Sequence, residues 1–307
     1  MMVERKKGRD FVKYVIFDCD STAGLPGKPM DDALALLYLL GRPREAEILG
    51  ITCTFANGTA AEVYESTSRL LREIGRTHIP LLRGAEAAED PRTEAARFIA
   101  DTVNARPGEI SLVAIGSLTN LYGAYLLDNS LFEKVKEIVL MGGYTAPVLY
   151  HGFHLEELNF SVNPEAAACV LNKGKNISIL TGNNTLEPSY LPKEEFMEKM
   201  TSGSAGARYI GEKCGYRFDT QGNRYGNPIS YCWDVVATVY LLHPELYEDD
   251  YANCFITKNG MHAGWLGVTE QARDTVILNL PKVKDLTAYR AEMYGGWLDF
   301  EIPEDAR

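Results

Sequence analysis

The segment FVKYVIFDCDSTAGLPGKPMDDALALLYLLG, residues 11–41, decides the fold of this chain. It opens with an apolar run at 11–18 that has the length of a buried strand. It closes with an apolar run at 33–41 that predicts a helix ending at Gly41. Between the two runs lie four aspartates, two at each end of a ten-residue connection rich in glycine and proline. The segment therefore predicts a strand, an acidic loop and a helix.

The same alternation of short and long apolar segments continues along the chain. Strand-like runs occur at 47–55, 110–116, 135–143 and 176–182, and helix-like runs at 60–75, 93–105, 118–128 and 163–174. Strands separated by helical crossovers form parallel sheets that are covered by helices on both faces. We therefore expect an α/β fold with a mostly parallel, doubly wound sheet flanked by helices, forming a single domain over residues 1–307.

The stretch from about 201 to 228 is the least periodic part of the sequence. Its Gly, Tyr and Arg residues predict a loop rather than a helix or strand. Such a loop is either a mobile segment over a binding site or an ordinary surface connection.

Composition and charge exclude several classes of partner. The chain is 46% apolar, and its net charge of −11 with a pI near 5.1 opposes binding to nucleic acid or to an anionic membrane surface. The sequence shows neither an apolar run of membrane-spanning length nor a signal peptide. The six cysteines lack the spacing of a zinc site or a disulfide framework, so we expect reduced thiols and a cytoplasmic location.

The four aspartates of the opening segment are its strongest chemical signal. Asp18 and Asp20 end the predicted strand, and Asp31 and Asp32 precede the predicted helix. Crowded carboxylates repel one another, so such a cluster normally has a cation to neutralise it. Oxygen ligands without His or Cys favour calcium or magnesium. The alternative for Asp31 and Asp32 is capping of the helix N-terminus, where acidic side chains are also favoured.

The run FDCDST at 17–22 resembles the first motif of haloacid-dehalogenase-type phosphatases. In those magnesium-dependent enzymes the first aspartate is a nucleophile and the second an acid. They also need a downstream Gly-Asp pair, and this sequence contains no Gly-Asp dipeptide. Phosphatase activity is therefore the runner-up hypothesis.

A second resemblance covers much more of the chain. VIFDCD followed by DDALALL, then ILGITCTFANGT, LVAIGSLTNL, IVLMGG, EELNFSVNPEAA and WDVVATVYLLHPELY resemble, in order, the motifs of the inosine-uridine preferring nucleoside hydrolases. The resemblance implies calcium-dependent hydrolysis of the N-glycosidic bond of ribonucleosides. It also implies that the protein is a homodimer or homotetramer. The expected partner is a small-molecule ribonucleoside substrate, and neither a nucleic acid nor a membrane.

The resemblance also implies a role for particular residues. Calcium would be held by the side chains of Asp20, Asp32 and Asp234 and by the main-chain oxygen of Ile115, and Asp20 would accept the proton of a calcium-bound water. Asp18 would support this loop without touching the ion. The alternative for Asp234 is to cap the helix predicted after it.

Four further residues would hold the ribose, namely Asp31, Asn57, Glu157 and Asn159. Carboxylates around the sugar suit this reaction, because positive charge develops at the anomeric carbon in an oxocarbenium-like transition state. The alternatives are that Asn57 and Asn159 merely form turns and that Glu157 is a solvated surface acid.

Two departures from the family pattern concern the first loop and the leaving base. The family usually has three residues between the two aspartate pairs, whereas ten intervene here, and we expect residues 21–30 to bulge outward so that Asp20 and Asp32 stay together. Many relatives carry His where this chain has Trp233, which implies stacking on the base and a weak preference for purine nucleosides. The alternative for Trp233 is a core aromatic.

Other groups near the base remain candidates. His151 and His154 are possible replacement acids for the leaving base, and Tyr225 and Tyr231 possible stacking partners. A third hypothesis is that the chain binds a ribosyl compound without cleaving it.

Overall fold

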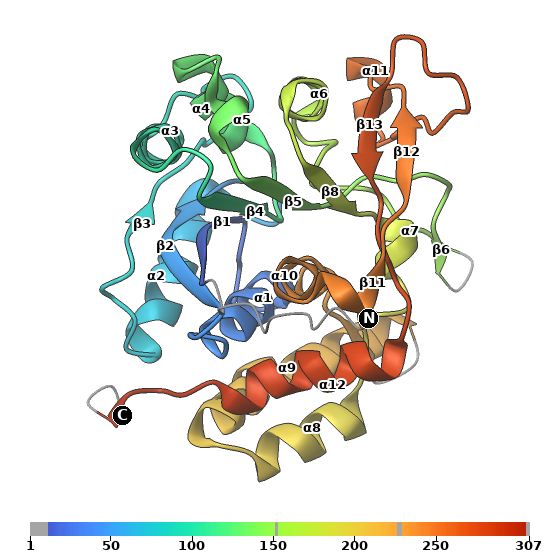
Figure 1. Cartoon of the computed structure of the whole chain (residues 1–307). Coiled ribbons are helices and arrows are strands. Elements are labelled where there is room, and N and C mark those ends of the chain that lie inside the picture. Colours follow the sequence, from blue (N-terminus) through green and yellow to red (C-terminus); the bar gives the residue numbers. More distant parts are fainter. Residues whose placement is uncertain (1–11, 151–152, 226–228, 305–307) are drawn as a thin grey trace, which may run out of the picture.

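The structure is a computed structural model that describes residues 12–150, 153–225 and 229–304 (Figure 1). At its centre lies an eight-stranded sheet in the order β12-β13-β8-β5-β4-β1-β2-β3. Neighbouring strands are parallel except for the antiparallel edge pair of β12 and β13. Its strands are β1 (Lys13–Cys19), β2 (Ala46–Cys53), β3 (Leu81–Leu82), β4 (Ile110–Ala114), β5 (Glu137–Met141), β8 (Ile177–Leu180), β12 (Tyr251–Cys254) and β13 (Val276–Asn279). The expected mostly parallel sheet is confirmed.

Helices cover both faces of this sheet, as Figure 1 shows. One face carries α3 (Glu94–Ala105), α4 (Thr119–Leu127), α5 (Leu131–Lys134), α6 (Pro164–Lys173) and α11 (Lys258–Met261). The other carries α1 (Asp31–Leu40), α2 (Ala60–Glu73), α10 (Val235–Leu242) and α12 (Leu286–Asp299), with α9 (Ala205–Tyr225) packed against them. In β1, Val15 and Phe17 face one apolar core and Ile16 the other. Burial on both faces explains why this strand reads as a continuous apolar run.

Smaller elements connect these layers. They are α7 (Gly182–Thr185), the 3-10 helix at Pro244–Leu246, and three two-stranded sheets formed by β6 (Leu149–Tyr150) with β7 (Phe153–His154), β9 (Tyr190–Pro192) with β10 (Ile229–Tyr231), and β11 (Tyr247–Glu248) with β14 (Lys282–Val283). Trp265 is 41% exposed and pairs through its backbone with Tyr144.

The prediction of a loop over 201–228 is wrong for the part that the structure describes. This region contains the end of α8 (Lys193–Ser202) and the long helix α9 (Ala205–Tyr225). Ala207, Ile210, Cys214 and Phe218 are buried at helical spacing on one side of α9. The intervening glycines and polar residues hide this stripe in the sequence, although they lie on a helix that packing stabilises.

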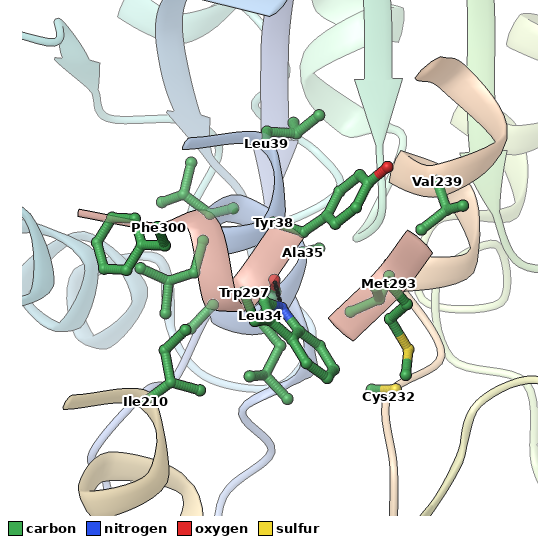
Figure 2. Close-up of a cluster of buried hydrophobic side chains, with 14 of the residues drawn as sticks. Leu34, Ala35, Tyr38, Leu39, Ile210, Cys232, Val239, Met293, Trp297 and Phe300 are labelled. Atoms are coloured by element: carbon green, nitrogen blue, oxygen red, sulfur yellow. Dashed lines mark hydrogen bonds between the residues drawn. The ribbon is translucent and has the colours of Figure 1, made fainter. Parts of the chain in front are cut away.

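Helix α1 is anchored by close packing against α12 (Figure 2). The fully buried Trp297 donates its indole N–H to the main-chain oxygen of Leu34 at 2.9 Å. A Cβ atom on Gly41 would lie 1.8 Å from the carbonyl oxygen of Gly296, so only glycine permits this approach of the two backbones. The packing fixes α1 with its first turn, which carries Asp31 and Asp32, at the carboxyl end of β1. Ligands of open α/β sheets bind at this edge.

Candidate active site

Five aspartates from distant parts of the sequence converge at the carboxyl edge of the sheet. Asp18 and Asp20 lie at the end of β1, Asp31 and Asp32 begin α1, and Asp234 directly precedes α10. The main-chain N–H of Asp20 donates to Oδ1 of Asp32 at 2.9 Å. Carboxylate oxygens of Asp31, Asp32 and Asp234 lie within 4.8 Å of one another. The ten residues between the two aspartate pairs therefore still leave Asp20 beside Asp32, as expected.

Helix capping does not account for these acids. In the part of the chain that the structure describes, no side-chain hydrogen bond caps the start of α1 or of α10, although Asp234 occupies the N-cap position of α10. Oδ1 of Asp31 and Oδ2 of Asp32 are buried and have no hydrogen-bond partner among the described residues. Buried carboxylate oxygens without a donor are costly. The cluster is thus incomplete without a further positively charged or donating group.

Burial and mutual repulsion raise the pKa values of this cluster. Burial, with the charges of neighbouring aspartates, raises the pKa of Asp32 and that of Asp234 well above the usual range. Burial also raises the pKa of Asp20 to about 6, although hydrogen bonds from Asn57 oppose it. For Asp31, burial raises the pKa and the nearby guanidinium of Arg217 opposes the shift. To be charged at neutral pH, these carboxylates need a cation beside them. Donor groups that are all oxygen fit a hard divalent ion.

The carboxylate of Asp20 is held by Asn57. Its Oδ2 accepts the main-chain N–H of Asn57 at 2.6 Å, and its Oδ1 accepts the side-chain amide at 3.1 Å. Asn57 lines a cavity, as a ribose-binding role requires, and it also orients the predicted proton acceptor. The sequence did not indicate this second contact, because the two residues come from different strand ends.

Asp18 ties three elements together beneath the cluster. Its Oδ2 accepts the hydroxyl of Thr52 in β2 at 2.6 Å and the side-chain amide of Asn120 in α4 at 2.8 Å. Burial raises the pKa of Asp18 to about 7, although both hydrogen bonds oppose the shift. It does not line the cavity in the described part of the chain. These contacts suit the supporting role that the sequence predicts.

A cavity of about 220 Å³ opens beside the aspartates. Its walls include Asp31, Asn57, Ile115, Glu157, Asn159 and Asp234. The side-chain amide of Asn159 donates to the main-chain oxygens of Ile115 at 3.0 Å and Met141 at 2.9 Å. These bonds join the ends of neighbouring β4 and β5 and fix the floor of the cavity.

Glu157 is an organised part of the cavity wall rather than a solvated surface acid. Its carboxylate accepts the main-chain N–H groups of Gly143 at 3.1 Å, Phe160 at 2.9 Å and Ser161 at 2.8 Å. Burial raises the pKa of Glu157, and these hydrogen bonds oppose the shift. The acid therefore holds Gly143 and the turn at 160–161 together beside the cavity.

Aromatic side chains form another wall. Trp233 and Tyr231 both line the cavity, and their rings stack with centroids 5.2 Å apart at an angle of 19°. Trp233 is therefore not simply a core aromatic. His154 is exposed on β7 and is absent from the described cavity lining, whereas His151 and the side chain of Tyr225 lie outside the described residues.

Arg217 and Tyr144 line the cavity without having been predicted from the sequence. Arg217 comes from α9, which was predicted as a loop. It is next in sequence to Phe218, one of the buried residues at helical spacing, and this spacing is the signal that could have placed Arg217 on a helix. Tyr144 follows the glycine pair after β5, and its ring lies over Gly182, where a Cβ atom would approach it to 2.2 Å. The Gly at 182 is thus needed to admit this ring.

Comparisons with known proteins bear on the family and the fold of this chain. The sequence matches the family model described as inosine-uridine preferring nucleoside hydrolase over residues 15–287. A probable uridine nucleosidase 2 of Oryza sativa subsp. japonica is 28% identical over 264 residues, which cover 76% of this chain and 75% of that protein.

Two solved structures share the fold. A plant nucleoside hydrolase superposes with a TM-score of 0.80 at 20% identity, covering 93% of this chain and 99% of the other. A purine-preferring ribonucleoside hydrolase from Gardnerella vaginalis gives a TM-score of 0.78 at 19% identity, covering 94% and 99%. In the described part of the chain, no helix has the length and apolar character needed to cross a membrane.

Proposed function

Because the chain belongs to the inosine-uridine preferring nucleoside hydrolase family, we propose that it cleaves ribonucleosides into ribose and free base. This makes it an N-glycosidase, in line with the names of its relatives. The observation that carries the proposal is the convergence of Asp31, Asp32 and Asp234 beside a cavity of about 220 Å³. One buried carboxylate oxygen of Asp31 and one of Asp32 have no hydrogen-bond partner among the described residues.

We propose that Ca²⁺ is held by Asp20, Asp32 and Asp234, together with the main-chain oxygen of Ile115. Asp20 and Asp32 are fully buried, whereas Asp31 is 9% exposed and lines the cavity. This difference in depth supports assigning Asp20 to the ion and Asp31 to the substrate, although the oxygens that cluster within 4.8 Å include Asp31 rather than Asp20. When bound, calcium would orient a water molecule and lower its pKa.

Asp20 is the proposed proton acceptor for the attacking water. Both of its oxygens are already oriented by Asn57, so its position is fixed before substrate arrives. Water attacks the anomeric carbon as the bond to the base breaks, Asp20 takes a proton from that water, and the departing base takes a proton from solvent. The surrounding carboxylates stabilise the positive charge that develops on the sugar.

The ribose hydroxyls would be held by Asp31 and Asn57 on one side and by Glu157 and Asn159 on the other. All four line the cavity, which supports this assignment. Holding the hydroxyls lets binding energy act on the sugar in the transition state. A 2′-deoxyribonucleoside should therefore react far more slowly, because buried polar groups would be left unpaired.

The base is proposed to stack on Trp233, with a weak preference for purines. Tyr231 stacks on the ring of Trp233 and supports it, and the indole offers a large aromatic surface that suits a two-ring base. One relative is named a uridine nucleosidase and another a purine-preferring hydrolase, so the family name alone does not decide this preference.

The remaining parts of the proposal rest on the family resemblance and on composition. We propose that residues 1–307 form one domain, that the enzyme is a homodimer or homotetramer, and that it acts in the cytoplasm. Gel filtration with light scattering measures the oligomeric state directly.

The experiment that tests the activity measures ribose release from inosine, guanosine, uridine and 2′-deoxyinosine, with calcium and with a chelator. We expect release from the ribonucleosides only with calcium, and none from an Asp20→Ala variant whose circular dichroism matches the wild type. Ligand binding without ribose release would identify a non-catalytic binding protein. Magnesium-dependent cleavage of a phosphate ester would identify a phosphatase instead.

A further inference from the structure

We infer that Lys28, in the lengthened loop after β1, is a positioning residue for the proton acceptor Asp20. The inference rests on the proposed function, since it concerns the orientation of Asp20 in that reaction. It gives residues 21–30, the part of the sequence that departs most from the family pattern, a definite task at the active site.

The loop 21–30 is an ordered structure held at several points. Its neck is closed by the Thr22 hydroxyl, which donates to the main-chain oxygen of Pro29 at 3.2 Å. Its turns use Gly24 and Gly27, at φ values of 76° and 73°, which glycine adopts without strain. The main-chain oxygen of Ala23 accepts hydrogen bonds from two α2 side chains, Ser66 at 2.7 Å and Arg69 at 3.0 Å.

Lys28 extends from this loop to the next one. Its Nζ donates to the main-chain oxygen of Asn57 at 2.6 Å, and the lysine is partly buried there. A hydrogen bond from a charged donor at this distance is among the stronger ones in proteins. The two loops also pack together, because a Cβ atom on Gly58 would lie 3.0 Å from the methyl group of Thr22.

The contact continues directly to Asp20. Lys28 holds the carbonyl of Asn57, while the N–H and side-chain amide of the same residue hold the two oxygens of Asp20. Asn57 thus has one anchor on the loop side and two on the catalytic side. Without Lys28, the backbone at Asn57 loses its anchor on the loop side, and the carboxylate of Asp20 loses its fixed orientation.

The test compares Lys28→Met with Lys28→Arg, which keeps a charged donor. Arg69→Met is the matched control, because it weakens the hold on the same loop at Ala23 without touching Asn57. For each variant, kcat and KM for inosine are measured, and the calcium affinity of the stripped enzyme is measured by calorimetry. Loss of a group that orients a metal ligand typically costs about 10- to 100-fold in metal affinity or activity.

We expect Lys28→Met to lower kcat and calcium affinity by about tenfold each, with a smaller rise in KM because Asn57 also holds the ribose, and Lys28→Arg to restore most of both losses. Arg69→Met should match the wild type within about twofold, since Ser66 still holds Ala23. The inference is overturned if Lys28→Met retains wild-type kcat and calcium affinity. It is also overturned if Arg69→Met shows the same loss, because loop order alone would then explain the effect.

The two proposals fail in different ways. A wild-type chain that binds calcium but releases no ribose contradicts the proposed function, while the calcium affinities of the variants still decide the role of Lys28. A wild-type chain that neither binds calcium nor releases ribose overturns both.

Discussion

The two ends of helix α1 each carry a group of acidic side chains, and only one group is neutralised by the protein itself. At the start of the helix, Asp31 and Asp32 meet Asp234, and each of the first two has a carboxylate oxygen without a hydrogen-bond partner in the described parts of the chain. At the far end, Arg42 and a histidine lie among acidic side chains of α12 and of two connecting segments. The helix dipole favours acids at the N-terminus of α1 and cations at its C-terminus.

The far end of α1 is a balanced network. Arg42 contacts Glu292 through Nε at 2.7 Å and Asp299 through a terminal nitrogen at 2.6 Å. His243 contacts Glu292 at 3.2 Å and Glu45 at 3.1 Å through Nε2. Although burial opposes the shift, hydrogen bonds from His243 and Arg42 lower the pKa of Glu292 to about 2.

The comparison teaches that burial of acids does not by itself mark a functional site. Both groups are at least partly buried, but at the far end each shifted acid has a cation, whereas at the start of α1 burial and repulsion raise the pKa values. A group of acids that is paired with cations stabilises the fold, whereas a group of acids without cations needs a ligand to neutralise it.

The largest expected effect comes from breaking the unbalanced group at Asp234. An Asp234→Asn variant should lose activity by about three orders of magnitude, because the metal supplies several kcal/mol of charge stabilisation. In chelator its melting temperature should rise, since one repelling charge is removed. Ribose release and thermal melts with and without calcium measure both effects. Full activity in this variant would contradict the assignment of Asp234 to the ion.

Breaking the balanced group should give the opposite result. Glu292→Gln should lower the free energy of unfolding by about 2 kcal/mol, because Arg42 and His243 lose their shared acid while remaining partly accessible to water. Activity per folded molecule should stay within about twofold of the wild type. Urea unfolding and steady-state kinetics test this.

Asp299→Asn is the matched control for Glu292→Gln. The side chain of Asp299 is 68% exposed, compared with 21% for Glu292, so its loss should change stability by less than about 1 kcal/mol. Equal losses from both variants would mean that burial does not distinguish the two contacts.

The pH dependence of stability should separate the two groups more finely. Asp18 and Asp20 have pKa values raised from 3.8 to about 7 and about 6, so between pH 4 and 7 the folded state holds protons that the unfolded state has released. Without metal, their contribution to stability therefore falls as pH rises through this range. Calcium should reduce this fall by stabilising the charged form of Asp20, its proposed ligand, whereas the contribution of Asp18 should remain.

In the balanced group, Glu292 contributes with the opposite sign, and His243 contributes with the same sign but at higher pH. The lowered pKa of Glu292 gives stability that is present above pH 4.5 and lost as pH falls toward about 2. Hydrogen bonding to Glu292 raises the pKa of His243 from 6.5 to about 9, so its contribution is present below pH 6.5 and lost as pH rises through 9. Urea unfolding midpoints of the wild type and of a His243→Gln variant, measured across this pH range, test both contributions.

The smallest effect is expected at His154, which belongs to neither group. It is exposed on β7, so a His154→Ala variant should keep ribose release and melting temperature close to the wild type. A loss of more than about tenfold in kcat would identify it as the acid that protonates the base.

The sequence predicts those parts of the fold whose signals are local. Strands with continuous apolar runs and helices that stop at glycine, such as the end of α1 at Gly41, were placed within a few residues. Helix α9 was missed because its buried stripe is interrupted by glycines, and the antiparallel strand β12 because its exposed edge lacks a strong pattern.

The site shows the same division. Motif order indicates which acids meet, but not that Asn57 holds Asp20 or that Arg217 lies beside Asp31. These contacts depend on how separate loops pack, which no local pattern in the sequence records.

The wall formed by Trp233 also gives the protein a built-in optical reporter. The chain has three tryptophans in three settings: Trp233 lines the cavity, Trp265 is 41% exposed, and Trp297 is fully buried between α1 and α12. With Trp265 replaced by phenylalanine, the fluorescence of Trp233 would report substrate binding and that of Trp297 would report global unfolding. A nucleoside quenching the first without disturbing the second would make binding visible before any bond is cleaved.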